Sequence, residues 1–374
     1  MSRSSIVFVV NSGPGSAMDV RAQSFAARLR SDAGIQIAYR APNKAYAVLK
    51  FLWLLLRFRP ALCYVLDMGF SGVLAAGIYR VISRTRLVVD TGDDIYQIAR
   101  SSGRPWIGLW LTKILEQFAL SISDRIVVRS HPHQELLAQR GITADVIPDG
   151  VDTEQFRPRP QAQLRGHYHL EGFTVIGILG SLIWNPRSQM CYGSELIEVI
   201  DRLRDRPVKG VVIGDGSGLA VLKRECLARG LEDRIVFLGA LPYDELPRFL
   251  NLMDVCLSTQ TNDLVGQVRT TGKLPLYLAS GRFVLASAVG EATRVLPSEM
   301  LLPYHGSKDT GYPGRLASRI EALLEHPEDL NQPELSTRIA QTHFEYNGLT
   351  ARLQDTIDRL LSDGFQVRRE RGVI

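Results

Sequence analysis

The sequence has few cysteines and no apolar run long enough to cross a membrane. The four cysteines, Cys63, Cys191, Cys226 and Cys256, lie far apart, so their spacing predicts neither a disulfide framework nor a zinc site. The longest hydrophobic stretch, residues 47–58, has about a dozen residues, whereas a spanning helix needs about 20. These absences exclude a small disulfide-stapled domain and favour folding in a reducing compartment.

The chain also has no large excess of charge of either sign. The formal net charge is +5 over 374 residues, and no dense tract of lysine and arginine occurs, so a nucleic-acid partner is not expected. Two histidine pairs, His131 with His133 and His167 with His169, have no third ligand near them in the sequence, and we predict no metal site. No signal peptide precedes the first predicted strand, which favours a cytoplasmic location.

The segment at 208–259 predicts one half of a doubly wound nucleotide-binding sheet. The apolar run at 211–213 is typical of a buried parallel strand, and Gly214 and Gly216 follow it. Glycines at this turn let a phosphate approach the backbone, and the next helix presents unpaired N–H groups; a plain tight turn is the alternative. Further elements then alternate, namely a helix ending at Arg229, a strand at 234–238, a helix at 243–253 and a strand at 255–258.

A similar loop follows the first strand of the chain. The run at 6–10 predicts a strand, Gly15 lies in the loop after it, and a helix is expected at 18–29. Strand, glycine loop and helix again suit a phosphate. Arg21 on this helix has two interpretations, an inward-pointing cation and a solvent-exposed helix charge.

Carboxylates gather at the end of a predicted strand at 87–89. Asp90, Asp93 and Asp94 occupy the carboxyl edge, where open α/β sheets bind their ligands. Asp90 or Asp93 has the chemistry to hold or deprotonate an acceptor hydroxyl. Alternatively, these acids cap the next helix.

Four motifs belong together: Gly214-Asp-Gly216, Phe237-Leu-Gly239, Pro242-Tyr-Asp-Glu245-Leu246 and Ile147-Pro-Asp-Gly-Val-Asp152. They resemble motifs of the family-4 retaining glycosyltransferases, which usually have asparagine at the position of Asp149. The resemblance covers nearly the whole chain. It implies the GT-B fold, an α/β architecture of two doubly wound Rossmann-like domains with an inter-domain cleft. The implied division is an acceptor-side domain at 1–160, a nucleotide-sugar-binding domain at 161–345, and a helix crossing back with a basic tail at 346–374.

The chain departs from the family's pattern at its charged positions. The family's histidine near the transferred sugar is replaced by Gly92. Its arginine and lysine for the donor diphosphate are replaced by Ser181 and Pro186, although Arg187 stands beside the latter.

The family's two donor-site glutamates are missing as well. Val268 and Leu276 occupy their positions, and a basic, hydroxyl-bearing loop with Arg269, Thr271 and Lys273 lies between them. Two cations and two hydroxyls are a suitable anion site; an ordinary helix-capping loop is the alternative.

We therefore predict transfer of a sugar from a nucleotide-sugar to a glycan or lipid-linked acceptor, with retention and without a metal or other cofactor. Positioning and electrostatics would supply the catalysis. Asp90 and Asp93 are the predicted catalytic residues. The predicted donor-binding residues are Gly15, Ser181, Arg187, Gly214, Gly216, Arg269, Thr271, Lys273 and Gly290.

Two other functions are compatible with these residues. The missing histidine, arginine and glutamates would suit a degenerate GT-B protein that binds an anionic ligand or a partner enzyme without transfer. A nucleotide-sugar epimerase of the same shape is the second alternative, although the segment at 147–152 is a glycosyltransferase feature.

The hydrophobic stretch from Ala47 to Phe58 carries Lys50, Trp53 and Arg57 on one helical face. It is compatible with an interfacial helix on a membrane surface, and equally with a core helix whose cations reach the solvent. With the family's lipid-linked acceptors, it favours a peripheral protein on the inner face of the cytoplasmic membrane, in bacterial polysaccharide or glycolipid assembly.

Overall fold

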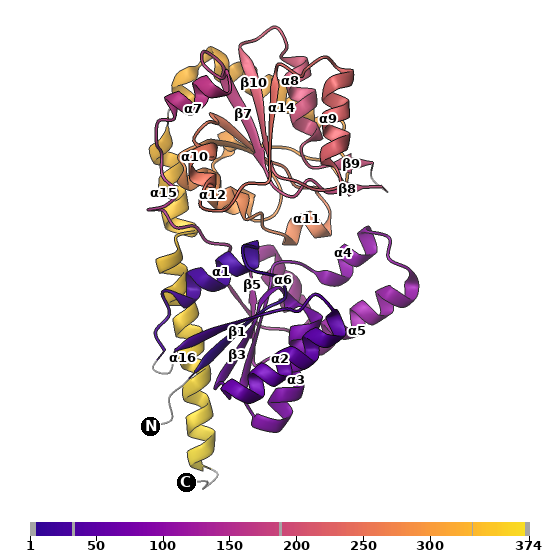
Figure 1. The fold of residues 1–374 in the computed structure, drawn as a ribbon, viewed down its shortest axis with the longest axis vertical. Coiled ribbons are helices and arrows are strands. Elements are labelled where there is room, and N and C mark those ends of the chain that lie inside the picture. Colours follow the sequence, from indigo (N-terminus) through magenta and orange to yellow (C-terminus); the bar gives the residue numbers. More distant parts are fainter. Residues whose placement is uncertain (1–4, 32–33, 187–188, 331, 371–374) are drawn as a thin grey trace. The chain divides into compact units, whose positions relative to one another are not determined.

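The computed structural model describes residues 5–31, 34–186, 189–330 and 332–370 (Figure 1). The chain divides into two compact units, a first of residues 1–150, 268–270 and 346–374 and a second of residues 151–267 and 271–345. The first unit ends earlier than the predicted boundary at 160. The reason is packing, because Val151 and Phe156 lie in the hydrophobic core of the second unit.

The first unit contains a six-stranded parallel sheet in the order β2-β1-β3-β4-β5-β6. Its strands are β1 (Ile6–Val10), β2 (Ile35–Tyr39), β3 (Leu62–Val65), β4 (Arg86–Thr91), β5 (Arg125–Val128) and β6 (Ala144–Val146). Its helices are α1 (Ala17–Ala26), α2 (Lys44–Phe58), the 3-10 turn η1 (Leu66–Met68), α3 (Phe70–Ser83), α4 (Ile95–Ser101), α5 (Trp106–Ile122), α6 (His131–Gln139) and α16 (Tyr346–Glu370).

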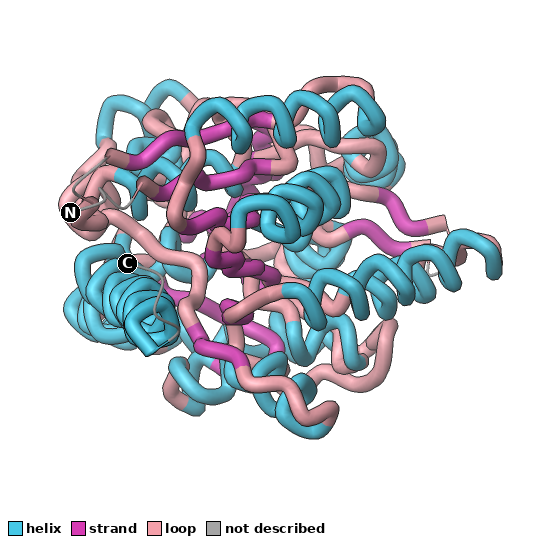
Figure 2. The backbone as a smooth tube through the Cα atoms, turned by 90° about the horizontal axis from the view of Figure 1, so that it is seen from below, coloured by secondary structure: helices cyan, strands magenta, loops and turns pink. Residues whose placement is uncertain are grey.

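Helices cover both faces of this sheet, which explains why its strands are apolar throughout (Figure 2). Val7 and Val9 of β1 face the core formed with α2, α3 and α5. Phe8 on the same strand faces the opposite core, where α1 and α16 pack. Successive side chains of β1 point to opposite faces of the sheet and therefore pack into two separate cores.

The loops that follow β1, β4 and β5 are fixed by helix caps. The Ser16 hydroxyl accepts a hydrogen bond from the Asp19 N–H, the Asp94 carboxylate from the Gln97 N–H, and the Ser130 hydroxyl from the His133 N–H. These caps hold α1, α4 and α6 at the carboxyl edge of the sheet. The capping interpretation is therefore correct for Asp94.

The second unit repeats the architecture with the strand order β11-β10-β7-β12-β13-β14. Its strands are β7 (Thr174–Leu179), β10 (Val208–Ile213), β11 (Ile235–Gly239), β12 (Val255–Ser258), β13 (Phe283–Ser287) and β14 (Leu301–Leu302), with a separate ribbon of β8 (Trp184–Asn185) and β9 (Met190–Cys191). Its helices are α7 (Ala162–His167), α8 (Ser194–Arg202), α9 (Leu219–Ala228), α10 (Leu246–Leu250), α11 (Leu264–Val268), α12 (Lys273–Ala279), α13 (Ala292–Val295), η2 (Ser298–Met300), α14 (Tyr312–Glu325), η3 (Pro327–Asp329) and α15 (Pro333–His343).

The predicted strands of the 208–259 segment are present, but two helices begin later than expected. The helix after Gly216 begins at Leu219, and the helix predicted at 243–253 is only Leu246–Leu250. No helix among the described residues is both long and apolar enough to span a bilayer.

A buried acid links α4 to α5. Glu116 is 6% exposed and its carboxylate accepts a hydrogen bond from the Tyr96 N–H at 3.2 Å. Burial, with a further contribution from the nearby Asp94 carboxylate, raises the pKa of Glu116 to about 7. The ionised form is therefore unfavourable in the folded protein.

We expect Glu116→Gln to stabilise the protein above about pH 7 and to change little well below pH 4.5. The folded carboxyl keeps its proton up to about pH 7 and the unfolded one releases it near 4.5, so native stability falls as the pH rises between these values. Glutamine avoids that loss and keeps an oxygen for the Tyr96 N–H. The gain in the free energy of unfolding is about 1–3 kcal/mol.

Urea unfolding at both pH values measures this gain. Glu232→Gln, at an exposed acid of the second unit, is the control. A gain for Glu116→Gln that is the same at both pH values would contradict the assignment.

Candidate active-site residues

Asp90, at the carboxyl end of β4, is a fully buried carboxylate held by three donors. Its Oδ2 atom accepts hydrogen bonds from Arg21 Nε and from the Tyr64 hydroxyl, both at 2.8 Å. Its Oδ1 atom accepts from Arg129 Nε at 3.3 Å. Both oxygens are therefore engaged, and the side chain presents no surface to a ligand in this arrangement.

The charges around the Asp90 carboxylate suit a structural role. Burial by itself raises the pKa of the Asp90 carboxyl, but the Arg21 and Arg129 guanidinium groups outweigh burial and hold that pKa below its usual range. Burial and the Asp90 charge together raise the pKa of the Tyr64 phenol well above its usual value. Asp90 thus stays ionised and Tyr64 stays protonated near neutral pH, so neither is poised to exchange a proton.

Arg21 points inward from α1, so its interpretation as a solvent-exposed helix charge is wrong. It is 1% exposed, and its two terminal nitrogens donate to the carbonyl oxygens of Pro148 at 2.7 Å and Ile147 at 2.8 Å. These carbonyls begin the motif at 147–152. Arg21 therefore ties α1 and β4 to the loop after β6, which gives the motif a structural role within the first unit.

Arg129 follows β5 and fills the space next to Gly92. A Cβ atom added at Gly92 would lie only 2.8 Å from Arg129 Nη1 and 2.9 Å from Arg129 Cδ. The guanidinium group also faces the carboxylates of Asp67 at 3.4 Å and Asp149 at 3.5 Å. The position where the resembled family has histidine is thus closed by a cation from a neighbouring strand.

We expect Gly92→Ala to lower the free energy of unfolding by about 1–3 kcal/mol, because the new methyl group displaces a buried guanidinium with three carboxylate neighbours. Gly13→Ala is the matched control, since an added Cβ there meets nothing within 4 Å. Thermal unfolding of both variants measures the difference. Equal stability of the two variants would show that Arg129 can move aside without cost.

Asp93 and Arg269 are paired with each other. Arg269 Nε donates to Asp93 Oδ1 at 2.7 Å, and a terminal nitrogen approaches Oδ2 at 3.3 Å, so the contact is bidentate. Residues 268–270 pack with the first unit, where the Ser130 hydroxyl also donates to the Val268 carbonyl at 2.5 Å. One residue predicted for the acceptor and one predicted for the donor phosphate therefore form a single ion pair.

The glycines after β10 serve close packing of two loops in the second unit. A Cβ atom at Gly214 would lie 1.9 Å from the Gly180 carbonyl oxygen, and one at Gly216 would lie 2.4 Å from the Leu182 oxygen. The Gly214 N–H donates to Gly239 O at 2.8 Å, and the Gly216 N–H donates to Asp215 Oδ1 at 2.7 Å. These two donors are used within the protein, which fits the tight-turn alternative.

Lys273 begins α12 and carries a half-buried ammonium group. Burial lowers its pKa, while the carboxylate of Glu195 opposes the shift. In the part of the chain that the structure describes, no hydrogen bond or ion pair engages this ammonium. Nearby in sequence, the Thr271 hydroxyl lies 3.3 Å from that of Ser258. A cation that is partly removed from water and has no direct ion pair is a position that a phosphate would stabilise.

The remaining predicted donor residues lie apart from this lysine in sequence. The Gly15 N–H donates to Asp19 Oδ2 at 2.7 Å, and the Gly290 N–H donates to Gln267 Oε1 at 3.0 Å. Ser181 is exposed in the loop between β7 and β8. Arg187 lies outside the described residues.

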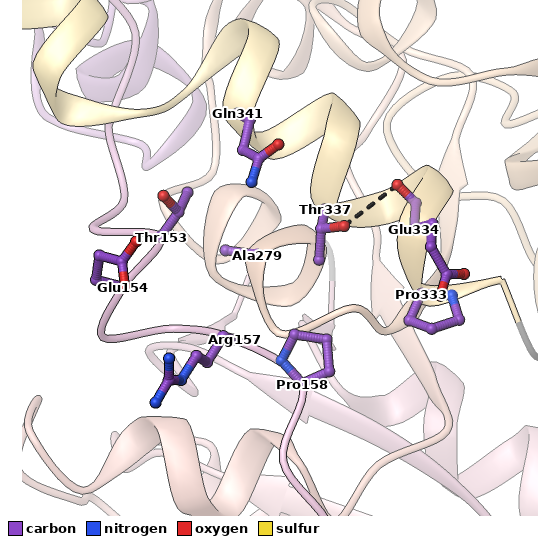
Figure 3. A pocket seen from close by; sticks show the side chains of 9 residues that line it. All are labelled: Thr153, Glu154, Arg157, Pro158, Ala279, Pro333, Glu334, Thr337 and Gln341. Atoms are coloured by element: carbon purple, nitrogen blue, oxygen red, sulfur yellow. Dashed lines mark hydrogen bonds between the residues drawn. The ribbon is translucent and has the colours of Figure 1, made fainter.

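A cavity of about 370 Å³ in the second unit lies elsewhere (Figure 3). It is bounded by the segment before α7, the end of α12 and one side of α15, and none of the predicted site residues lines it. Its lining residues are Thr153, Glu154, Arg157, Pro158, Ala279, Pro333, Glu334, Thr337 and Gln341. Among the described residues, no three histidine, cysteine or acidic side chains are grouped to hold a metal ion.

Sequence reasoning missed Arg129 and the Asp93–Arg269 pair. A usable signal for Arg129 was present, because an arginine directly follows the apolar strand at 125–128 and parallel strands end at one edge of a sheet. The pairing of Asp93 with Arg269 joins residues 176 apart in sequence and has no local signal.

Part of the chain is similar to proteins of known family. Residues 174–326, from β7 to the end of α14, match the family described as glycosyl transferases group 1. The 2-deoxystreptamine glucosyltransferase of Streptomyces kanamyceticus is 30% identical over 202 residues, which are 51% of this chain and 47% of that protein. The alpha-monoglucosyldiacylglycerol synthase of Streptococcus pneumoniae is 24% identical over 265 residues, 68% of this chain and 57% of that protein.

The chain thus spans about half the length of the curated relatives it matches. Among solved structures, HepE of Anabaena in complex with UDP-glucose has a TM-score of 0.74 at 18% identity, over 95% of this chain and 99% of that chain. At this identity the likeness concerns the fold, and it confirms the predicted pair of doubly wound units. Residues 174–326 are therefore similar to the group 1 glycosyl transferases, and the chain as a whole has the GT-B fold.

Proposed function

We propose that this protein transfers a sugar from a nucleotide-sugar donor to a glycan or lipid-linked acceptor, with retention of configuration and without a metal. The observation that carries the proposal is the group 1 match over most of the second unit, which contains the unpaired Lys273. The relatives named above are a glucosyltransferase and a glycolipid synthase, which supports bacterial polysaccharide or glycolipid assembly as the setting.

On the donor side, we assign Lys273 to the diphosphate. Its half-buried ammonium has no direct ion pair among the described residues, and a phosphate oxygen would both pair with it and offset its desolvation. Thr271 supplies a hydroxyl two residues away. Arg269 would join them only by exchanging the Asp93 carboxylate for a phosphate. Gly214 and Gly216 then act by shaping the loop, because their N–H groups are already bonded.

On the acceptor side, we divide the two predicted acids by role. Asp93 is half-buried, and it orients the acceptor hydroxyl once Arg269 has released its carboxylate. Asp90 is a positioning residue, because it is fully buried and reaches a ligand only through Arg21 and Arg129.

The proposed reaction needs no covalent intermediate on the protein. The acceptor oxygen bonds to the anomeric carbon as the bond from that carbon to the diphosphate oxygen breaks. The hydroxyl proton passes to the departing diphosphate, whose negative charge Lys273 stabilises. Catalysis of this kind rests on orientation and on preorganised charge.

A degenerate GT-B protein that binds an anion without transfer is the second candidate. Specific observations favour it: Arg129 closes the position of Gly92, and Asp93 is occupied by Arg269. Binding of a nucleotide is common to both candidates, so turnover separates them.

Calorimetric titration with uridine, guanosine and adenosine diphosphates and their sugars tests the donor site. We expect one nucleotide to bind, and Lys273→Ala to weaken its binding about 10- to 100-fold, as expected for a charged hydrogen bond. Lys223→Ala, at an exposed lysine of the same unit, is the matched control. Unchanged affinity in Lys273→Ala would remove this residue from the site, and no binding by any nucleotide would refute the proposal.

A further inference from the structure

Large apolar side chains are exposed on one part of the first unit. In the described residues, all but three of the exposed large apolar side chains lie on α2, α3 and α5; the exceptions are Ile183, Leu227 and Leu264. The most prominent ones are Leu49 and Trp53 on α2, Val81 and Ile82 on α3, and Trp106 and Trp110 on α5. Val81 is 85% exposed and Trp106 is 76% exposed. Soluble monomers rarely expose apolar groups in such numbers on adjacent elements.

These three helices cover the same face of the first unit's sheet, with α3 beside both α2 and α5 (Figure 1). Each is apolar on two sides. On α2, Phe51 and Leu55 are buried in the core, whereas Leu49, Trp53 and Leu56 form an outward stripe with helical spacing. The two interpretations of the segment at 47–58, a core helix and an interfacial helix, therefore hold for opposite sides of one helix. We call the outward side of α2, α3 and α5 the apolar face.

The charges on these helices are of one sign. Their single acid, Glu116, is buried, whereas Lys50, Arg57 and Lys113 supply cations. Arg80 on α3 is already paired with the Asp124 carboxylate. Arg57 lies over the Trp53 ring, 5.7 Å from its centroid. A surface with cations beside exposed tryptophans matches the headgroup region of an anionic bilayer.

We propose that the apolar face docks on an anionic lipid membrane, with its tryptophans in the headgroup layer and its cations near lipid phosphates. Three of the four tryptophans of the chain, Trp53, Trp106 and Trp110, lie on this face. Amphipathic rings of this kind concentrate at membrane interfaces. The proposal rests on these surfaces alone and does not depend on sugar transfer.

A second copy of this chain is the less suitable occupant. In a twofold dimer the same face meets itself, so Arg57 and Lys113 would face further cations with no exposed acid from these helices to pair with. An anionic bilayer supplies the missing negative charge over the whole face.

Vesicle binding of the full chain without nucleotide tests the proposal. We expect binding to vesicles of phosphatidylglycerol and phosphatidylcholine in equal parts, with a blue shift of tryptophan fluorescence, and much weaker binding to phosphatidylcholine alone. Leu49→Ser should weaken binding about tenfold. Leu227→Ser is the matched control, because Leu49 is 64% exposed and Leu227 on α9 is 62% exposed. Arg57→Gln should weaken binding about fivefold on the anionic vesicles only.

The proposal is overturned if Leu49→Ser and Leu227→Ser bind alike, or if neutral vesicles bind as tightly as anionic ones. It is also overturned if the protein forms dimers in lipid-free buffer that Leu49→Ser dissociates, because a second copy then covers the face. A protein that does not bind vesicles can still bind a nucleotide at Lys273. Failure of the membrane proposal can therefore be told apart from failure of the proposed function.

Discussion

The first unit depends on one buried carboxylate, Asp90, and the two guanidinium groups that pair with it. Arg21 comes from α1, Arg129 follows β5, and the carbonyls of Ile147 and Pro148 complete the coordination of Arg21. Four segments distant in sequence are thereby fixed at the carboxyl edge of the sheet. Removing one partner of such a buried pair costs about 3–5 kcal/mol, because the other charge stays buried without compensation.

This network also explains why the usual histidine is absent at Gly92. Arg129 reaches Asp90 and Asp149 through the space that a side chain at this position would need. The positive charge beside Gly92 therefore comes from a residue that follows a neighbouring strand. In the second unit, the half-buried Lys273 ammonium is the group that we propose for a phosphate.

The fold could be predicted because its signals are local. Apolar runs such as 211–213, followed at once by glycines, specify strand and turn from adjacent residues. The site was less predictable because its pairings are long-range. Arg129 and Asp90 are 39 residues apart, and Asp93 and Arg269 are 176 apart, so only the folded sheet brings them together.

The apolar face could also be predicted only in part from the sequence. The segment at 47–58 was recognisable as amphiphilic from its own residues, but nothing local showed that the apolar side chains of α3 and α5 would be exposed beside it. Which side of a helix faces the solvent depends on how the sheet covers it, as with Val81 and Ile82 outside and Ala76 and Tyr79 inside on α3. A helix that is apolar on both sides gives no sequence signal for which of them is buried.

The central claim, that the chain catalyses sugar transfer, is tested most directly by nuclear magnetic resonance of the purified protein with each nucleotide-sugar. The account predicts that one donor is consumed, that its nucleoside diphosphate is released, and that the sugar leaves with retained configuration. The same spectrum of Lys273→Ala should show the donor intact. Binding of a nucleotide without any turnover, or the appearance of an epimer of the donor, would contradict the account.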